Sequence, residues 1–300
     1  MSPMLKTIFV ATLCLSNVTN LALASEDGAQ VTFFDVGNDI CALAETPSVS
    51  VIFTDTLDPK GLCFKSLTAL EGQLSNPLLV NLSGHTGNSE AWDKAFSLSR
   101  VVDMKSVTER KVEEELMLFG NTRLLILPLA KLHDRGAGFI SKLSFAHLSL
   151  LFASNNASDG ASDINADCAQ SGHVYDADTA HDLNSDLMLV PNSGGTPLLS
   201  HCFLETVSPH FAVFSAGSGR DQPTTGVANH YLQLGLQRYN MLRTDRGDDE
   251  SGNEWKDGLT VTGCIDRPGD DTIIASLTSS GSLDVVYAMP ELACQGPSDG

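Results

Sequence analysis

The hydrophobic pattern divides the chain into short apolar runs separated by polar turns. After the first 24 residues, three such runs occur in quick succession, at residues 31–36, 40–44 and 49–54. They are rich in valine, isoleucine and phenylalanine, and turn residues lie between them at Gly37–Asn38 and Thr46–Pro47. Short runs with this composition and these boundaries are typical of β-strands. The sequence therefore predicts three strands at the start of the fold.

The middle of the chain alternates strand patterns with helical ones. Apolar residues recur at helical intervals over residues 63–74, and Asn88 or Ser89 can cap a helix that continues to Leu98. A charged amphipathic helix is expected over residues 107–119, and further helices are expected up to Val207 and over residues 227–236. Apolar runs that predict strands lie at residues 77–82, 99–104, 123–129, 143–154, 187–190, 210–217 and 238–244.

Two segments lack apolar periodicity, and strands return at the end. Residues 155–185 are rich in Asp, Ser, Asn and Ala, which predicts a solvated acidic insertion, and residues 246–257 resemble a polar linker. A C-terminal β extension is expected from about residue 258, with strands at 259–265, 271–277 and 283–289. Strands at both ends, with β–loop–helix units between them, favour an α/β fold. We expect one domain over residues 25–300, either a four-layer αββα sandwich or another two-layer α/β domain.

The first 24 residues are typical of a secretory signal. A short basic start precedes a largely apolar stretch, and Ala22-Leu23-Ala24 has the small-x-small pattern of a cleavage site. We expect cleavage after Ala24 and export to the periplasm or the extracellular space; the alternative is an uncleaved membrane anchor. Further along, we expect no stable membrane span, because later apolar stretches fall short of the ~20 residues that one requires.

The cysteines agree with an oxidising compartment. Removal of the signal removes Cys14 and leaves an even number of cysteines, without the CxxC or CxxH spacing of a zinc knuckle. Connectivity does not follow from sequence, but sequential pairing closes the shortest loops and is therefore favoured. The predicted disulfides are Cys41–Cys63, Cys168–Cys202 and Cys264–Cys294.

The charge distribution argues against a nucleic-acid partner. The chain has a formal net charge of −19. Residues 143–219 contain no Lys or Arg but many Asp residues. Phosphate backbones would be repelled by such a region, because nucleic-acid binding depends on positive charge.

Several motifs together resemble the metallo-β-lactamase fold, and in particular the hydrolase domain of bacterial DNA-uptake competence proteins. They occur in the order of that family and cover roughly residues 31–247. They are "VTFFDVGNDICAL", "VIFTDTL", "LVNLSGHTGNSEAWDKAFSLSRVVD", "LMLVPNSGG", "VSPHFAVFSAG", the segment at Pro223, and "YNMLRTD". The resemblance implies a metallo-β-lactamase-like αββα sandwich.

The resemblance also implies a site that has lost most of its metal ligands. The family carries His-x-His-x-Asp-His where this chain has Ser83, His85, Gly87 and Asn88. It tends to carry His-His-Gly-Ser where this chain has Asn192 and Ser193, and often His-Pro where this chain has Gln222 before Pro223. Asp55 matches an acid near the family's pocket. The vacated-site positions are therefore Asp55, Ser83, His85, Gly87, Asn88, Asn192, Ser193 and Gln222.

Other residues that could carry chemistry are more simply explained as ordinary loop residues. His85 is the remaining candidate metal ligand, although a loop histidine bonded to backbone is the simpler interpretation. The histidines and aspartates of residues 173–182 are a candidate zinc or calcium site, but they lack the glycine and terminal glutamate of a calcium loop, and a solvated acidic loop is the simpler interpretation. The calcium-like start at residues 163–167 is followed by Cys168 where a calcium loop has glycine. Ser83, Ser193 and Ser218 lie outside any G-x-S-x-G motif, which argues against a serine hydrolase.

Three hypotheses follow. The favoured one is an exported, non-catalytic binding or assembly module, with no cofactor and with an unknown protein or small molecule as its ligand. The second is a metal-dependent, phosphodiesterase-like hydrolase that uses zinc or another divalent ion, with His85, Asp55 and an acid of the insertion as substitute ligands. The third is an unrelated secreted domain stabilised by disulfides.

Overall fold

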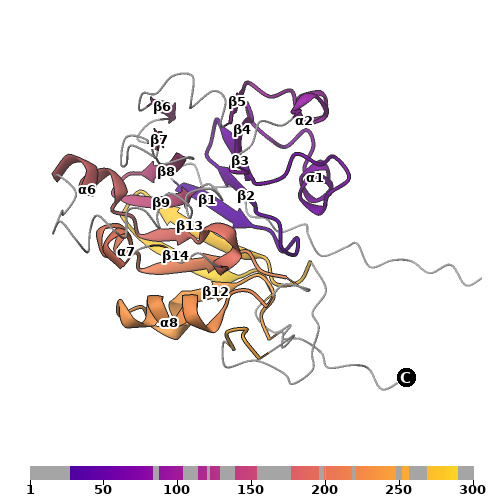
Figure 1. Cartoon of the computed structure of the whole chain (residues 1–300). Coiled ribbons are helices and arrows are strands. Elements are labelled where there is room, and N and C mark those ends of the chain that lie inside the picture. The colour runs from indigo at the N-terminus through magenta and orange to yellow at the C-terminus, as the bar shows by residue number, and fades with distance from the viewer. Residues whose placement is uncertain are drawn as a thin grey trace, which may run out of the picture.

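Two seven-stranded sheets form the centre of the computed structural model (Figure 1). It describes residues 28–83, 88–103, 114–119, 122–128, 139–153, 177–195, 199, 201–217, 221–247, 252–256 and 269–289. The strand orders are β14-β13-β1-β2-β3-β4-β5 in the first sheet and β12-β11-β10-β9-β8-β7-β6 in the second.

The first sheet is mixed. Antiparallel pairing joins β14, β13, β1, β2 and β3, whereas β3, β4 and β5 are parallel. The C-terminal strands therefore extend the sheet beside β1. The bounds are β1 (Gly28–Phe33), β2 (Cys41–Glu45), β3 (Ser50–Thr54), β4 (Leu78–Asn81), β5 (Arg100–Val102), β13 (Ile273–Thr278) and β14 (Leu283–Tyr287).

The second sheet is also divided into an antiparallel half and a parallel half. Its antiparallel half contains β6 to β9, and its parallel half contains β9 to β12. The bounds are β6 (Glu114–Phe119), β7 (Thr122–Pro128), β8 (Phe139–Phe145), β9 (Leu148–Ala153), β10 (Leu187–Leu189), β11 (Phe211–Phe214) and β12 (Met241–Arg243).

Helices cover the outer face of each sheet (Figure 1). α1 (Leu62–Thr68) and α2 (Glu90–Phe96) lie beside the first sheet, and α7 (His201–Val207) and α8 (Thr225–Gln233) lie beside the second. α6 (Ala177–Leu183) precedes β10, and short 3₁₀ helices follow β10 (η1, Pro191–Gly194) and precede β12 (η2, Arg238–Asn240).

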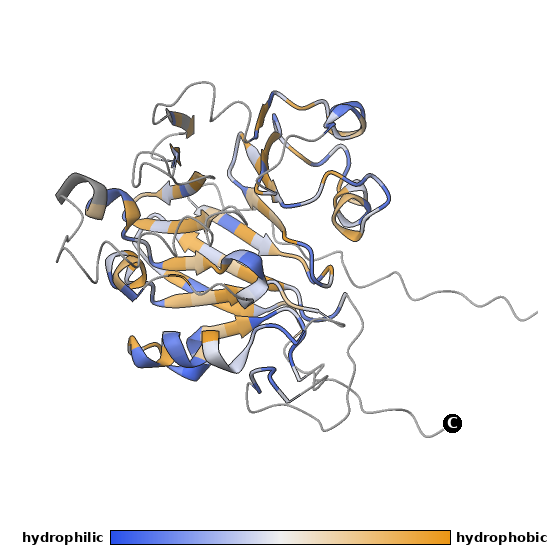
Figure 2. Ribbon diagram, in the orientation of Figure 1, coloured by the Kyte–Doolittle hydropathy of each residue, from blue (hydrophilic) through white to orange (hydrophobic). Residues whose placement is uncertain are grey.

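Three apolar cores alternate with the two sheets. The strands of both sheets are largely hydrophobic (Figure 2). Between the sheets, the rings of Phe53 and Phe152 stack with their centroids 3.8 Å apart. Their neighbours point the opposite way, because side chains alternate along a strand: Ile52 packs with α1 and α2, and Leu151 packs with α7 and α8. These layers confirm the αββα sandwich.

One predicted helix is wrong. Residues 114–119, within the helix expected over 107–119, form β6, which pairs with β7 in an antiparallel hairpin. Leu116 and Leu118 pack against the core between the sheets, whereas Glu115 is exposed. The two-residue spacing of these leucines fits a strand, and pairing with β7 outweighs the helix preference of Glu, Leu and Met.

The two segments expected to be solvated also contain ordered elements. The end of the predicted insertion forms α6, and its Leu183 is fully buried; residues 154–176 lie outside the described part. In the predicted linker, Glu254 and Trp255 are each 2% exposed. Glu254 is buried in an ion pair with Arg243. The polar composition of this segment therefore did not indicate that its residues are exposed to solvent.

The disulfide between Cys41 and Cys63 is confirmed and ties β2 to α1. Cys202 is disulfide-bonded as well. Its predicted partner Cys168, the pair Cys264–Cys294 and the predicted signal lie outside the described residues. Within the ranges given above, no helix is long and apolar enough to cross a membrane.

Candidate functional site

Several of the vacated-site positions lie where parallel strands end. Asn192 and Ser193 follow β10, Asp55 follows β3, and Ser83 comes shortly after β4. The loops after β11 and β12 leave the second sheet at the same edge as the β10 loop, since these strands are parallel. Ligands of α/β proteins bind at such carboxyl ends, so we take this edge as the candidate site.

The loop after β10 has an unusual backbone. Asn192 and Ser193 adopt left-handed conformations with φ of 54° and 52°, and Gly194 follows with φ of 75°. Such angles are uncommon for residues other than glycine and persist only where the surroundings enforce them. A Cβ atom on Gly194 would lie 2.6 Å from Pro223 Cβ and 2.8 Å from Phe214 Cδ1. The loop is therefore held tightly against its neighbours.

The turn between β1 and β2, residues 36–40, packs directly against the loops of the second sheet. The Ser193 hydroxyl donates to the carbonyl oxygen of Asn38 at 3.3 Å. The Ser215 hydroxyl donates to the carbonyl oxygen of Asp39 at 2.7 Å. A Cβ atom on Gly217 would lie 2.3 Å from Gly37 Cα, so the two backbones meet where only glycine fits. The 36–40 turn thus closes the edge between the loops that follow β10 and β11.

Asp55 supports the same turn from the first sheet. Its Oδ1 accepts a hydrogen bond from the backbone N–H of Ile40 at 2.7 Å. The acid that the family resemblance places near a metal pocket therefore anchors backbone here. Ser83 lies in a local turn, in which its N–H donates to Asn81 Oδ1 at 3.1 Å.

The remaining predicted positions do not all join this cluster. Asn88 lies at the start of α2, where its side-chain oxygen accepts from the N–H of Glu90 at 2.9 Å. Gln222 lies against the β10 loop, since a Cβ atom on Gly195 would be 2.3 Å from Gln222 Nε2. His85 and Gly87 lie outside the described residues.

The described donors do not fit the metal centre that the family resemblance implies. Ser83, Asn88, Asn192, Ser193 and Gln222 offer neutral hydroxyl and amide groups, which are poor ligands for transition ions. The Asp55 carboxylate is engaged by Ile40. Across the described ranges, no group of three or more His, Cys, Asp or Glu residues is placed to hold a metal ion.

The sequence interpretation missed a buried ionic cluster after β12, which we call the Arg243 cluster (Arg243, Asp245 and Glu254). The Arg243 side chain is fully buried, donates to Asp245 Oδ1 at 2.6 Å and also donates to Glu254 Oε1. Its Nη1 donates to the carbonyl oxygen of Trp255. The alternation of acids and arginines beside an apolar strand was the available signal.

A second ionic pair continues this cluster toward the first sheet. Arg246 Nε lies 3.3 Å from Asp271 Oδ1, and the Arg246 guanidinium lies 4.2 Å from the centre of the Tyr287 ring. The Tyr287 hydroxyl bonds to both the N–H and the carbonyl of Arg243, each at 3.2 Å. Charged and aromatic side chains therefore bind the end of β12 to β14 of the other sheet.

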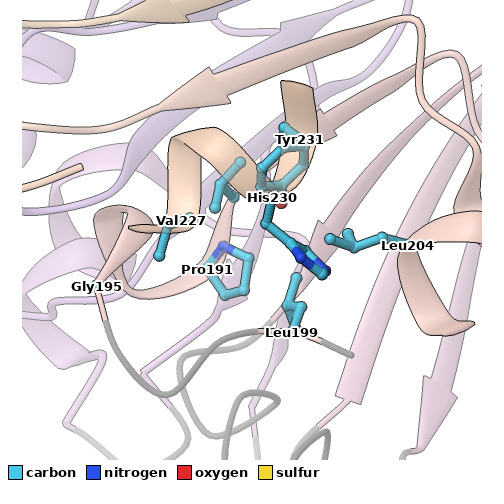
Figure 3. A pocket seen from close by; sticks show the side chains of 8 residues that line it. Pro191, Gly195, Leu199, Leu204, Val227, His230 and Tyr231 are labelled. Atoms are coloured by element: carbon cyan, nitrogen blue, oxygen red, sulfur yellow. The ribbon is translucent and has the colours of Figure 1, made fainter. Parts of the chain in front are cut away.

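A small cavity lies behind the β10 loop (Figure 3). Its volume is about 10 Å³, room for about one water molecule. The side chains that line it are apolar apart from Tyr231 and His230, and the His230 ring points between Leu199 and Leu204. Burial, and then the charge of His201, lowers the pKa of His230. The imidazole is therefore favoured in its neutral form, and the cavity is too small for an organic substrate.

Comparisons with known proteins identify no family for this chain. No family model matches the sequence. No curated protein matches it. Among solved structures the chain is similar to a CmlA beta-hydroxylase mutant, with 12% identity and a TM-score of 0.40 over 73% of this chain and 52% of the other. The chain thus spans about half the length of that protein. The two mixed sheets and their flanking helices form the αββα arrangement that was expected from the sequence.

Proposed function

We propose that this protein is an exported, non-catalytic binding or assembly module built on a metallo-β-lactamase-like fold. The observation that carries the proposal is the packing of the 36–40 turn into the candidate site. Ser193, Ser215 and Asp55 direct their polar atoms to the backbone of that turn. Side chains engaged in this way stabilise the edge, and they are not presented to a substrate.

The chemistry of the edge supports the same proposal. Hydrolysis in this fold needs a metal-activated water, and a metal needs three or four N, S or O ligands. The described vacated-site positions offer one carboxylate, Asp55, and neutral groups. The hydrolase hypothesis would therefore require Asp55 to lose its hydrogen bond with the Ile40 N–H. It would also require further metal ligands from elsewhere in the chain.

Export is part of the proposal. Disulfides persist in oxidising compartments, and both the Cys41–Cys63 bond and the bonded Cys202 fit such a compartment. The ligand is then an extracytoplasmic protein or small molecule. The acidic surface expected from the sequence argues against nucleic acid.

Hydrolysis assays test the proposal. We expect phosphodiester, thioester and β-lactam substrates to be hydrolysed no faster with the purified mature chain than in buffer alone. The result should be the same with or without added Zn²⁺ or Mn²⁺, because no activated water forms. A chelator-treated sample is the control. Metal-dependent turnover that disappears in His85→Ala would instead support the hydrolase hypothesis.

A further inference from the structure

Asp35 links the turn that closes the site to the segment that enters the last hairpin. It lies two residues after the end of β1 and is 6% exposed. Its Oδ2 accepts from the N–H groups of Gly269 at 2.5 Å and Asp270 at 3.2 Å, and its Oδ1 accepts from the N–H of Gly37 at 3.4 Å. One buried carboxyl group thus ties the 36–40 turn to residues 269–272, more than two hundred positions away along the chain.

The charges near Asp35 are mostly negative. Asp270 and Asp271 belong to the segment packed against it, and the charge of Asp270 raises the pKa of Asp35. Asp271 Oδ1 lies 3.3 Å from Arg246 Nε, so the Arg246 guanidinium forms its ion pair with Asp271. On the turn itself the titratable residue is Asp39, whose carbonyl accepts from Ser215.

Burial makes Asp35 responsive near neutral pH. Loss of solvation is the largest effect and raises the pKa of Asp35 to about 7, although hydrogen bonds from Gly269 and Gly37 lower it. The folded state binds this proton more readily than the unfolded chain does, so protonation of Asp35 stabilises the folded state. The stability contribution is complete below the ordinary pKa of 3.8 and is lost as the pH rises through about 7.

We propose that Asp35 is a pH-dependent latch, which holds the 36–40 turn in place when ionised and releases it when protonated. A protonated carboxyl group becomes a hydrogen-bond donor on one of its oxygens. That oxygen keeps only part of its acceptor capacity, and both oxygens lose the negative charge that strengthens a hydrogen bond from an N–H group. Oδ2 accepts from Gly269 and Asp270, and the Asp271 backbone also donates to the carboxyl group, whereas the Gly37 contact with Oδ1, at 3.4 Å, is longer than those of Gly269 and Asp270. The Gly37 contact is therefore the one that protonation removes.

The latch acts at the candidate site and does not depend on what binds there. Gly37 is the residue that meets Gly217, and Asn38 is bonded to Ser193. Loosening Gly37 weakens the closure of the edge below neutral pH. Protonation therefore has opposite effects: the whole fold gains stability from the neutral Asp35, while the 36–40 turn loses order. A general change in protein charge would not change the stability of the fold and the order of the 36–40 turn in opposite directions.

Hydrogen exchange and thermal unfolding, measured on the same mature chain at pH 8, at pH 5.5 and at steps between them, test this directly. Loss of one hydrogen bond should accelerate exchange in a peptide covering residues 34–40 by roughly fivefold at the lower pH, after correction for intrinsic rates. In Asp35→Asn this acceleration should vanish, and the gain in melting temperature on acidification should be smaller than in the wild type. Asp270→Asn should move the midpoint of the exchange profile to lower pH. The exposed Asp284→Asn is the matched control and should leave the profile unchanged.

The latch is overturned if corrected exchange in residues 34–40 is the same at both pH values. It is also overturned if Asp35→Asn keeps the wild-type dependence, or if Asp284→Asn shifts the midpoint as far as Asp270→Asn does. If Asp35→Asn does not fold, Asp270→Asn decides alone, and an unmoved midpoint rejects the latch.

Discussion

Replacing Arg243 by methionine is expected to lower the free energy of unfolding by about 3–5 kcal/mol. The guanidinium is fully buried between Asp245 and Glu254, whose side chains are 4% and 1% exposed. Removing it leaves two carboxylates in a medium that solvates them poorly, and that cost exceeds the value of the ion pairs themselves. Denaturant unfolding of the mature chain measures the loss.

Arg123→Met is the matched control for this substitution. Arg123 pairs with Glu115 at 3.2 Å, but both side chains are about half exposed. Its loss should cost no more than ~1 kcal/mol. Adding Asp245→Asn and Glu254→Gln to Arg243→Met should recover part of the stability, because neutral amides are easier to bury than carboxylates. Equal losses in the two arginine variants would contradict the tight coupling of the Arg243 cluster.

Gly217→Ala is expected to have the second largest effect, a loss of about 2–3 kcal/mol. The added methyl group would lie 2.3 Å from Gly37 Cα and 2.6 Å from Gly37 carbonyl carbon, so backbone must move to admit it. The loop after β11 and the 36–40 turn would separate, which weakens the closure of the candidate site. Chemical denaturation, together with hydrogen exchange in residues 36–40, reports both changes.

Gly252→Ala is the control, because nothing lies within 4 Å of the added methyl group. Its stability should stay within ~0.5 kcal/mol of the wild type. If Gly217→Ala were tolerated equally well, with unchanged exchange in the turn, then the two backbones would not be pressed together as described.

Local patterns predicted most of the strands, because apolar runs bounded by Gly or Pro are direct signals of strand and turn. β6 was missed because Glu, Leu and Met favour helices locally, while its pairing with β7 is what decides its structure. The segment around Glu254 was taken for a linker because polarity alone does not distinguish solvated charges from charges buried in pairs. In both cases, the deciding contacts lie outside the window that a local pattern covers.

For the candidate site, the sequence interpretation named the positions where family ligands would be replaced. Of the described ones, Asp55, Asn192 and Ser193 lie just after strands, whereas Asn88 lies at the start of α2. The interpretation did not predict what the residues at this edge do instead. The hydroxyls of Ser193 and Ser215 bond to a turn that lies 155 and 176 positions away along the chain. Such contacts depend on how the two sheets pack, and no spacing within one segment encodes them. The same holds for Asp35 and its partners near Gly269.

The metal content of the mature chain tests the central proposal most directly. Elemental analysis would be made after purification, and again after refolding with excess zinc, manganese or iron, on the wild type and on His85→Ala. Because the vacated-site positions supply few suitable ligands, we expect far less than one ion per chain in every sample and no difference between the two proteins. One tightly held ion per chain, lost in His85→Ala, would contradict the non-catalytic proposal and support a rebuilt hydrolase centre.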